Sequence, residues 1–420
     1  MSESESESVG AADTAPRSAF AYRAFVLYWL ARFFNSFAIQ IVSVAVGWQI
    51  YDETRNPFLL GMVGLVQFAP ALLFVLATGA VADRYDRRVV MGLCIALEAI
   101  CAASLGIFWV LHTAEVDIGH PIWPVFVILT LFGLARAFLT PSLQALAANL
   151  VPREAFANAV AWNSSAMQAS FTIGPAIGGL LYGISFQVPY IVAFAMFCVA
   201  MVLTALIPRT SQRSSGEKRS IETMLAGVRY IRSNPVVLGA ITLDLFAVLL
   251  GGVMALLPVF ARDILDAGPM GLGLLRSAAG VGALLTAIYL VRNPIRNHAG
   301  RIMFAGVAVY GLSIAVFGLS TTLWLSIPML FVMGAADMLS VNVRATLIQL
   351  ATPDDVRGRV SAVNSVFIGA SNEVGEFRAG TMAALVGAVP AVVIGGAGAI
   401  GIAALWARLF PDLYNKQKVT

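Results

Sequence analysis

Charged residues are scarce in this chain. Asp, Glu, Lys and Arg make up 12% of its 420 residues, whereas a soluble domain carries about 25%. A soluble protein of this size needs a polar surface around its core, so the deficit excludes most soluble folds. Apolar residues account for 59% of the chain and fall in runs of about 20, the length that crosses a bilayer as a helix. The sequence therefore predicts a multi-pass membrane protein.

Signals of catalysis and of cofactor binding are also missing. No Gly-x-x-x-x-Gly-Lys-Ser/Thr loop is present, which argues against ATP-driven transport. Cys94, Cys101 and Cys198 lie inside apolar runs without metal-ligand spacing, and no nucleophile, base and orienting residue form a set. We expect neither an enzyme nor a metal site. The net charge is +4, and the basic residues that produce it lie in short loops between apolar runs. We therefore expect no nucleic-acid partner.

Hydropathy, together with Gly, Pro and charge punctuation, predicts twelve spans in two sets of six. They cover residues 24–50, 58–82, 88–111, 121–148, 157–183, 187–208, 236–261, 269–291, 301–319, 322–350, 358–386 and 389–410. The predicted organisation is a disordered cytoplasmic tail (1–22), a six-helix bundle (23–208), a cytoplasmic linker (209–235), a second six-helix bundle (236–410) and a cytoplasmic tail (411–420). The linker contains an amphipathic stretch at 221–231.

Basic residues are distributed unequally between the two sides of this layout. Twenty of the 27 Lys and Arg residues lie on the side that holds both termini, and only Arg55 and Arg262 lie on the other. Retained cytoplasmic loops accumulate positive charge. We therefore expect both termini to be cytoplasmic.

The two halves are related by an internal repeat. A gap-free shift of 201 residues aligns 133–179 with 334–380 and gives 11 identities in 47 positions. A second register, at 212, aligns the first two spans with the seventh and eighth. Matched pairs include Pro152 with Pro353, Asn163 with Asn364, Gly179 with Gly380 and, at 212, Gly61 with Gly273. Two halves in the same orientation predict an all-α fold of two pseudo-symmetric six-helix bundles that rock around a central site.

Residues 79–88 read Gly-Ala-Val-Ala-Asp-Arg-Tyr-Asp-Arg-Arg. This segment resembles the loop signature of the major facilitator superfamily, Gly-x-Leu-Ala-Asp-Arg-x-Gly-Arg-Arg, from which Val81 and Asp86 depart. The resemblance implies a cytoplasmic latch in which Asp83 meets the start of the eleventh span, near residues 356–360. The latch residues would be Gly79, Asp83, Arg84, Arg87 and Arg88. The alternative is that the arginines serve only as positive-inside charge.

Four further segments, 46–52, 150–154, 173–179 and 371–377, resemble the branch of this superfamily that contains enterobactin-type siderophore exporters and related drug effluxers. Gly174-Pro175 in the fifth span resembles an element that marks its exporters. Pro175 is expected to bend its helix, because it removes a backbone hydrogen bond. A kink required only for packing is the alternative.

Several ionisable residues lie within predicted spans. Such a group costs about 2.5–3.5 kcal/mol at a helix centre on insertion scales, so each should face a partner or an aqueous cavity. The cavity and coupling candidates are Arg32, Arg136, Asp244, Asp337, Arg344, Glu373, Glu376 and Arg378. Glu98 and Arg276 are further intramembrane charges. Proton coupling requires a carboxyl group that exchanges its proton near working pH, and Asp337 is the first choice among Asp337, Glu373, Glu376, Asp244 and Glu98.

Two pairs of these charges are repeat-related, since Arg32 maps to Asp244 and Arg136 to Asp337. In the superfamily, helices 1, 4, 7 and 10 line the central cavity. We expect Arg32 with Asp244 to close the cytoplasmic side, and Arg136 with Asp337 to contact substrate or proton. The alternative is that every charge pairs within its own half. Glu373 and Glu376, one turn apart near Arg378, are equally compatible with a structural role.

These features predict a monomeric, proton-coupled exporter of a small amphipathic molecule, of siderophore or drug type, in the lipid of a bacterial inner membrane. It would work by alternating access with the proton gradient as its energy source and without a cofactor. An importer or lipid translocator on the same scaffold, and a membrane sensor that binds without transporting, remain alternatives.

Overall fold

The computed structural model describes residues 18–113, 122–147, 149–209, 221–295 and 297–416. These ranges are helical apart from short turns, and no strand occurs within them. The prediction of an all-α protein is therefore confirmed for the described part of the chain.

The first half contains the helices α2 (Arg23–Thr54), α3 (Pro57–Leu73), α4 (Val75–Arg84), α5 (Arg87–Thr113), α6 (Trp123–Ala147), α7 (Arg153–Ile184) and α8 (Val188–Ala205). Their bounds lie within a few residues of the predicted spans. The second span differs, because it is interrupted at Phe74 and divided into α3 and α4. The interruption comes one turn after Pro70, which lacks the N–H that a continuous helix needs.

The second half contains α9 (Ile221–Ser233), α10 (Pro235–Gly251), α12 (Gly268–Arg292), α13 (Ala299–Leu319), α14 (Leu323–Ala351), α15 (Asp354–Val386) and α16 (Ala388–Leu409). The predicted seventh span is also divided, since α10 stops at Gly251. It is followed by η2 (Met254–Leu256), α11 (Leu257–Val259) and η3 (Phe260–Ile264). Gly251-Gly252 allows this break, since glycine is a poor helix former.

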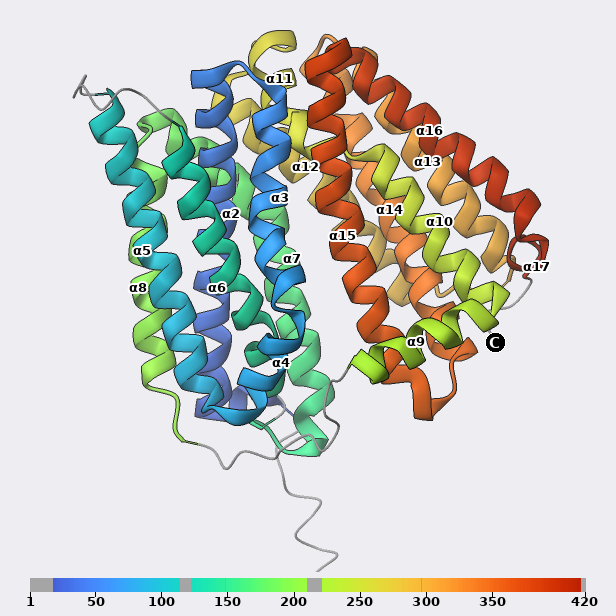
Figure 1. The fold of residues 1–420 in the computed structure, drawn as a ribbon, viewed down its shortest axis with the longest axis horizontal. Helices are drawn as coiled ribbons and strands as arrows, with labels where there is room; N and C mark the ends of the chain where they lie inside the picture. The colour runs from blue at the N-terminus through green and yellow to red at the C-terminus, as the bar shows by residue number, and fades with distance from the viewer. Residues whose placement is uncertain (1–17, 114–121, 148, 210–220, 296, 417–420) are drawn as a thin grey trace, which may run out of the picture.

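Figure 1 shows helices α2–α8 on one side of the molecule and α10 and α13–α16 on the other, with α11 and α12 at the divide. Across the described ranges, nine helices are long and apolar enough to cross a membrane, with α10 through η3 counted as one. Three further helices, α3, α7 and α15, run beside them (Figure 1) but are shorter or more polar. The polar character of α7 and α15 has a structural reason: α7 packs on α12 and α15 packs on α3, across the divide between the halves.

The contacts between the halves repeat the internal symmetry of the sequence. A Cβ added to Gly179 of α7 would lie 3.0 Å from the Cα of Gly273 in α12, and one added to Gly380 of α15 would lie 2.9 Å from the Cα of Gly61 in α3. Gly179 matches Gly380, and Gly273 matches Gly61, in the repeat registers. The two contacts are therefore equivalent, as a two-fold relation between the halves requires.

The segments outside the bundles are only partly as predicted. Residues 1–17 and the linker residues 210–220 lie outside the described ranges. Residues 18–22 are not disordered, because Ala19 is fully buried and its N–H donates to Asn158 Oδ1 at 2.9 Å.

The amphipathic stretch forms α9, which packs on α10 and α15. The end of the chain adds α17 (Pro411–Tyr414), and Lys416 accepts a hydrogen bond from Gly300 N at 3.1 Å.

Candidate functional site

Two pairs of charged residues join the halves at one end of the molecule. Asp52 and Arg55 lie at the end of α2, and Arg262 and Asp263 lie in η3. Arg262 pairs with Asp52 at 2.7 Å, and Arg55 pairs with Asp263 at 2.6 Å. The hydroxyl of Tyr51 also donates to Asp263. We call these five residues the α2–η3 cluster, and their end of the molecule the sealed end.

The α2–η3 cluster was not predicted from the sequence. Arg55 and Arg262 entered the argument only as isolated basic residues on one side of the membrane, and the two acids were not singled out. The register of 212 does place Tyr51 on Asp263. This register could therefore have indicated that the end of α2 and the segment η3 are equivalent and lie close to the two-fold axis.

A cavity of about 430 Å³ lies between the halves. Its polar lining consists of Gln40, Ser43, Gln67, Arg136 and Gln168 from the first half and Arg276, Glu373 and Glu376 from the second. Valine, leucine, isoleucine, phenylalanine and proline make up most of the remainder. A mostly apolar wall with a few converging polar groups suits an amphipathic ligand.

Three of the four spans that the resemblance implied line the cavity: α2, α6 and, through η2 and α11, the seventh span. The tenth span does not, because no lining residue belongs to α14, and α12 and α15 contribute in addition. α12 and α15 are the helices of the second half that pack most extensively on the first. Their side chains therefore reach the divide.

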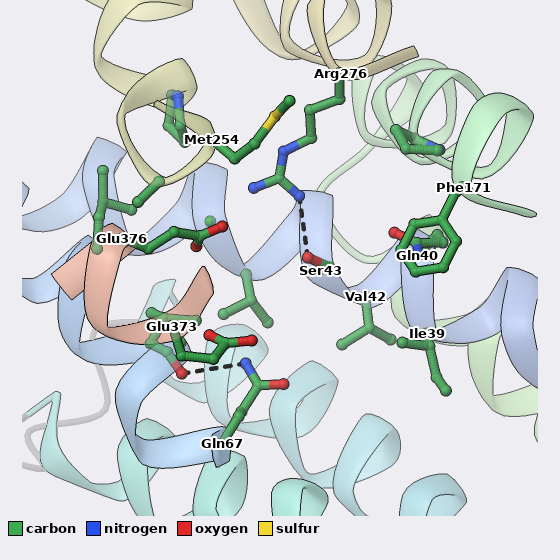
Figure 2. Close-up of a pocket in the computed structure, with 18 of the residues that line it drawn as sticks. Ile39, Gln40, Val42, Ser43, Gln67, Phe171, Met254, Arg276, Glu373 and Glu376 are labelled. Carbon is green, nitrogen blue, oxygen red and sulfur yellow. Dashed lines mark hydrogen bonds between the residues drawn. The ribbon is translucent and has the colours of Figure 1, made fainter. Parts of the chain in front are cut away.

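Arg276 extends from α12 across the cavity. Its Nη1 donates to Ser43 Oγ of α2 at 3.0 Å, and Figure 2 shows the side chain reaching this hydroxyl. Its Nε is buried without a hydrogen-bond partner. A Cβ on Gly47 would lie 3.5 Å from Nη2, so glycine gives the guanidinium room. The guanidinium of Arg276 thus lies on the cavity wall with its hydrogen-bonding capacity only partly used.

Glu373 and Glu376 form the opposite wall, on α15. A Cβ on Gly64 of α3 would collide with Glu373 Oε2 and would lie 3.6 Å from Glu376 Oε2, so both carboxylates converge over this glycine. In Figure 2 the carboxylate of Glu373 lies beside the amide of Gln67. Neither glutamate forms an ion pair within 4.0 Å among the described residues. The structure thus brings these two predicted residues to the cavity.

Arg136 lies on the cavity wall in α6, where its Nη1 donates to Gln67 Oε1 at 3.4 Å. Its repeat mate Asp337 is not in the lining. Asp337 lies within the second half, where its charge acts on Tyr310 of α13. Of the two residues predicted to contact substrate or proton, Arg136 lines the cavity in this conformation and Asp337 does not.

Asp244 pairs with Arg344, not with Arg32. The two side chains form an ion pair between α10 and α14, and the residues are 7% and 4% exposed. Arg32 instead donates to the hydroxyl of Tyr28 at 3.3 Å and approaches Met167 Sδ at 3.8 Å. Asp244 and Arg344 follow the alternative of pairing within one half, since opposite charges in one bundle neutralise each other without crossing the divide.

Arg378 has a structural role. Its Nε donates to Leu249 O at 2.8 Å, and its Nη2 donates to Leu250 O. These are the last carbonyls of α10, which the break at Gly251 leaves without helical partners. In a membrane such carbonyls need another donor. Arg378 supplies it, and this corrects its prediction as a cavity residue.

The predicted latch is described only in part. The side chain of Asp83 lies outside the described residues, although its backbone belongs to α4. Arg87 is buried and donates to Ala145 O at 3.5 Å, and Arg88 donates to Ile207 O at 2.7 Å. These two arginines tie the start of α5 to its own half. Gly79 is buried in α4 and Arg84 is exposed. A latch contact with α15 stays a prediction.

Gly174 and Pro175 lie inside α7, which continues through them from Arg153 to Ile184. A Cβ on Gly174 would lie 2.7 Å from the Cβ of Gln40, so α7 and α2 meet closely here. Pro175 lines the cavity. The next residue, Ala176, donates its N–H across the divide to Ser277 Oγ at 3.1 Å. The element thus lies at the junction of the two halves.

The family model described as "Transmembrane secretion effector", MFS_3, matches residues 14–416. This chain belongs to that family. The resemblance to major facilitator transporters is thereby confirmed, and so is the expectation that the chain is not an enzyme.

Proteins similar to this chain in sequence include two that are named as efflux or export proteins. Macrolide efflux protein A of Streptococcus pyogenes is 25% identical over 373 residues, which is 83% of this chain and 88% of that protein. Enterobactin exporter EntS of Citrobacter koseri is 23% identical over 394 residues, 93% of this chain and 92% of that protein. In fold, the chain resembles a bacterial homologue of the human lysosomal transporter Spinster, with a TM-score of 0.71 and 15% identity over 94% of this chain and 96% of that one. The MFS_3 chain is a membrane transporter with the major facilitator fold.

Proposed function

We propose that this transporter is a proton-coupled exporter of a small amphipathic molecule, which works by alternating access. The central cavity carries the proposal: it lies between the two halves and is lined by charges from both, Arg136 on one side and Arg276, Glu373 and Glu376 on the other. A site shared by two bundles changes shape when they rock against each other.

The proposal includes an orientation, with both termini in the cytoplasm of a bacterium. The sealed end then faces outward, because Arg55 and Arg262 lie there and basic residues are otherwise concentrated on the opposite side. The described ion pairs between the halves belong to the sealed end, and Figure 1 shows the two groups of helices diverging toward α4 and α9. This conformation would accept substrate from the cytoplasm.

Coupling is assigned to Glu373 and Glu376. They converge on the cavity without an ion pair among the described residues, so a proton and a polar group of the substrate would compete for them. Such competition is the basis of antiport: release of one ligand on each side allows the other to bind. The transporter would act as a monomer in lipid, with protons and substrate as its partners.

Inside-out vesicles test this proposal. With an acidic lumen, they should accumulate an exported substrate, and collapse of the pH gradient should stop accumulation. The macrolide and enterobactin named for the relatives are the first compounds to test, followed by metabolites retained in a deletion strain. Uptake that occurs only in right-side-out vesicles would favour an importer, and a bound compound that shows no counterflow in liposomes would favour a sensor.

A further inference from the structure

Glu98 is a buried acid that the cavity does not include. It lies in the middle of α5 and is 0% exposed; neither carboxylate oxygen has a hydrogen bond of good geometry, and Asn35 is the polar side chain within reach of it. An ionised carboxylate without partners is very costly in an apolar interior, whereas a protonated one is not. Its surroundings therefore require a neutral carboxylic acid in this conformation.

The groups around Glu98 come from three helices. α2 contributes Asn35, which is 3% exposed and whose side chain lies within hydrogen-bonding reach of Glu98. α6 contributes Arg136, whose charge acts on Glu98. α8 carries no charged residue, and the titratable neighbours on α5 itself are Cys94 and Cys101.

Arg136 has an acid on either side of it. Its charge acts on Glu98 within its own half and also on Glu373 of the other half. The described hydrogen bond of its guanidinium is the long one to Gln67 at 3.4 Å. The guanidinium therefore interacts electrostatically with a buried acid and with a cavity acid, and it forms a described ion pair with neither.

We propose that Glu98 is a second proton-holding residue of this transporter and that Arg136 links its proton to the occupancy of the cavity. When a proton or a cationic group of a substrate neutralises Glu373, Glu98 becomes the only acid that Arg136 can stabilise. As the halves rock, the O–H bond of Glu98 breaks, the proton passes to a water molecule that reaches it, and the carboxylate pairs with the guanidinium. Loss of the ligand from Glu373 reverses these steps. The inference deepens the proposed proton coupling and rests on it.

Infrared titration of the purified protein tests the link without any substrate. The wild type should show carbonyl bands of buried, protonated carboxylic acids at neutral pH, and Glu98→Gln should lack one of them. Glu154→Gln, at an exposed position of α7, is the matched control and should keep every band. A wild type without such bands, or an unchanged set of bands in Glu98→Gln, overturns the proposal.

The role of Arg136 is tested by the pH at which the band of Glu98 disappears. Arg136→Gln should raise that pH by about one unit or more, because the carboxylate loses its counter-charge. Glu373→Gln should lower it, because the arginine loses its other acid. A glutamate that does not interact with Arg136 would respond to neither change, and two unchanged titrations would overturn the link. Because these measurements involve no transport, they are distinguishable from a failure of the proposed function, which the vesicle assay reports.

Discussion

Arg276 is the cavity residue with the clearest unused binding capacity. One of its nitrogens binds Ser43 across the divide, and its Nε is buried without a partner. A buried donor without a partner is unfavourable until a ligand accepts its hydrogen bond, and charged hydrogen bonds contribute about 1.5–3 kcal/mol. The residue is therefore expected to contribute strongly to substrate affinity.

Arg276→Gln should lower the initial rate of transport at limiting substrate by about tenfold or more, since about 1.4 kcal/mol corresponds to a factor of ten. Arg408→Gln, at an exposed position near the end of α16, is the matched control and should leave the rate unchanged. Vesicles with equal amounts of inserted protein provide the measurement. An unchanged affinity in Arg276→Gln would remove this arginine from the site.

Glu373 and Glu376 carry the second prediction at this scale. Replacing both by Gln removes the groups that exchange protons in the cavity but keeps their size and polarity. Accumulation driven by a pH gradient should fall to the level seen with the gradient collapsed. The comparison of the double variant with and without the gradient checks this. Gradient-driven accumulation that persists would place the coupling carboxyl elsewhere, with Glu98 and Asp337 as the remaining candidates.

Charged residues within apolar runs could be identified from the sequence, because each one is conspicuous there. The uncharged polar residues that line the cavity could not be identified in this way. Gln40, Ser43 and Gln67 resemble any polar residue on a long helix, and only the close approach of α2, α3 and α12 shows that they share a cavity with Arg276. The role of Gly64 could not be identified from the sequence either. It depends on two carboxylates of the second half that lie over this glycine.

At the scale of the helices, Asp244 and Arg344 fasten α10 to α14. Removal of one partner leaves a buried charge unpaired and costs about 3–5 kcal/mol, whereas replacement of both by apolar residues is often tolerated. Asp244→Leu should therefore lower the thermal unfolding temperature in detergent markedly, and Asp244→Leu with Arg344→Met should recover most of the loss. Recovery by the double variant identifies the pair as structural. A double variant as unstable as the single one would contradict this interpretation.

Helix boundaries were predicted well because hydropathy changes sharply where helices leave the membrane. The breaks within spans were not predicted, because hydropathy does not change where they occur. Gly251 and Pro258 interrupt the seventh span without making it more polar, so the interruption leaves no trace in hydropathy. Arg378 was consequently interpreted as a cavity residue, although it binds the carbonyls that this break exposes.

At the scale of the whole molecule, the α2–η3 cluster holds the sealed end together. Arg262→Asp places two acids against each other and should favour the conformation open at this end. Asp52→Arg combined with Arg262→Asp restores an attractive pair and should reverse the effect. Exposed ion pairs contribute only about 0.2–1 kcal/mol each, so the populations should shift several-fold and not completely.

Spin labels on the ends of α2 and α12 next to this cluster would measure the shift as a longer distance in Arg262→Asp. Arg301→Asp, an exposed arginine within the second half, serves as the control for added negative charge. Equal distance distributions in the wild type and Arg262→Asp would show that the cluster does not hold the halves together.

The two glycine contacts between the halves carry the last prediction. A side chain at Gly273 would collide with the backbone of α7, since a Cβ there lies 2.6 Å from Pro175 O. Gly273→Val should therefore also separate the halves at the sealed end. The symmetry-related Gly61→Val should act in the same direction, and the same spin labels would detect both. An effect at only one of the two positions would argue that the contacts are not equivalent.

The membrane environment, the helices and the internal repeat of this protein follow from local composition, because apolar length fixes the spans and a repeat is visible in the order of residues. Which charges meet follows from the packing of the helices. Electrostatic partners depend on side chains that reach each other through space, so Arg344, and not the repeat mate Arg32, neutralises Asp244, and the ends of α2 and η3 form a contact that neither segment reveals alone.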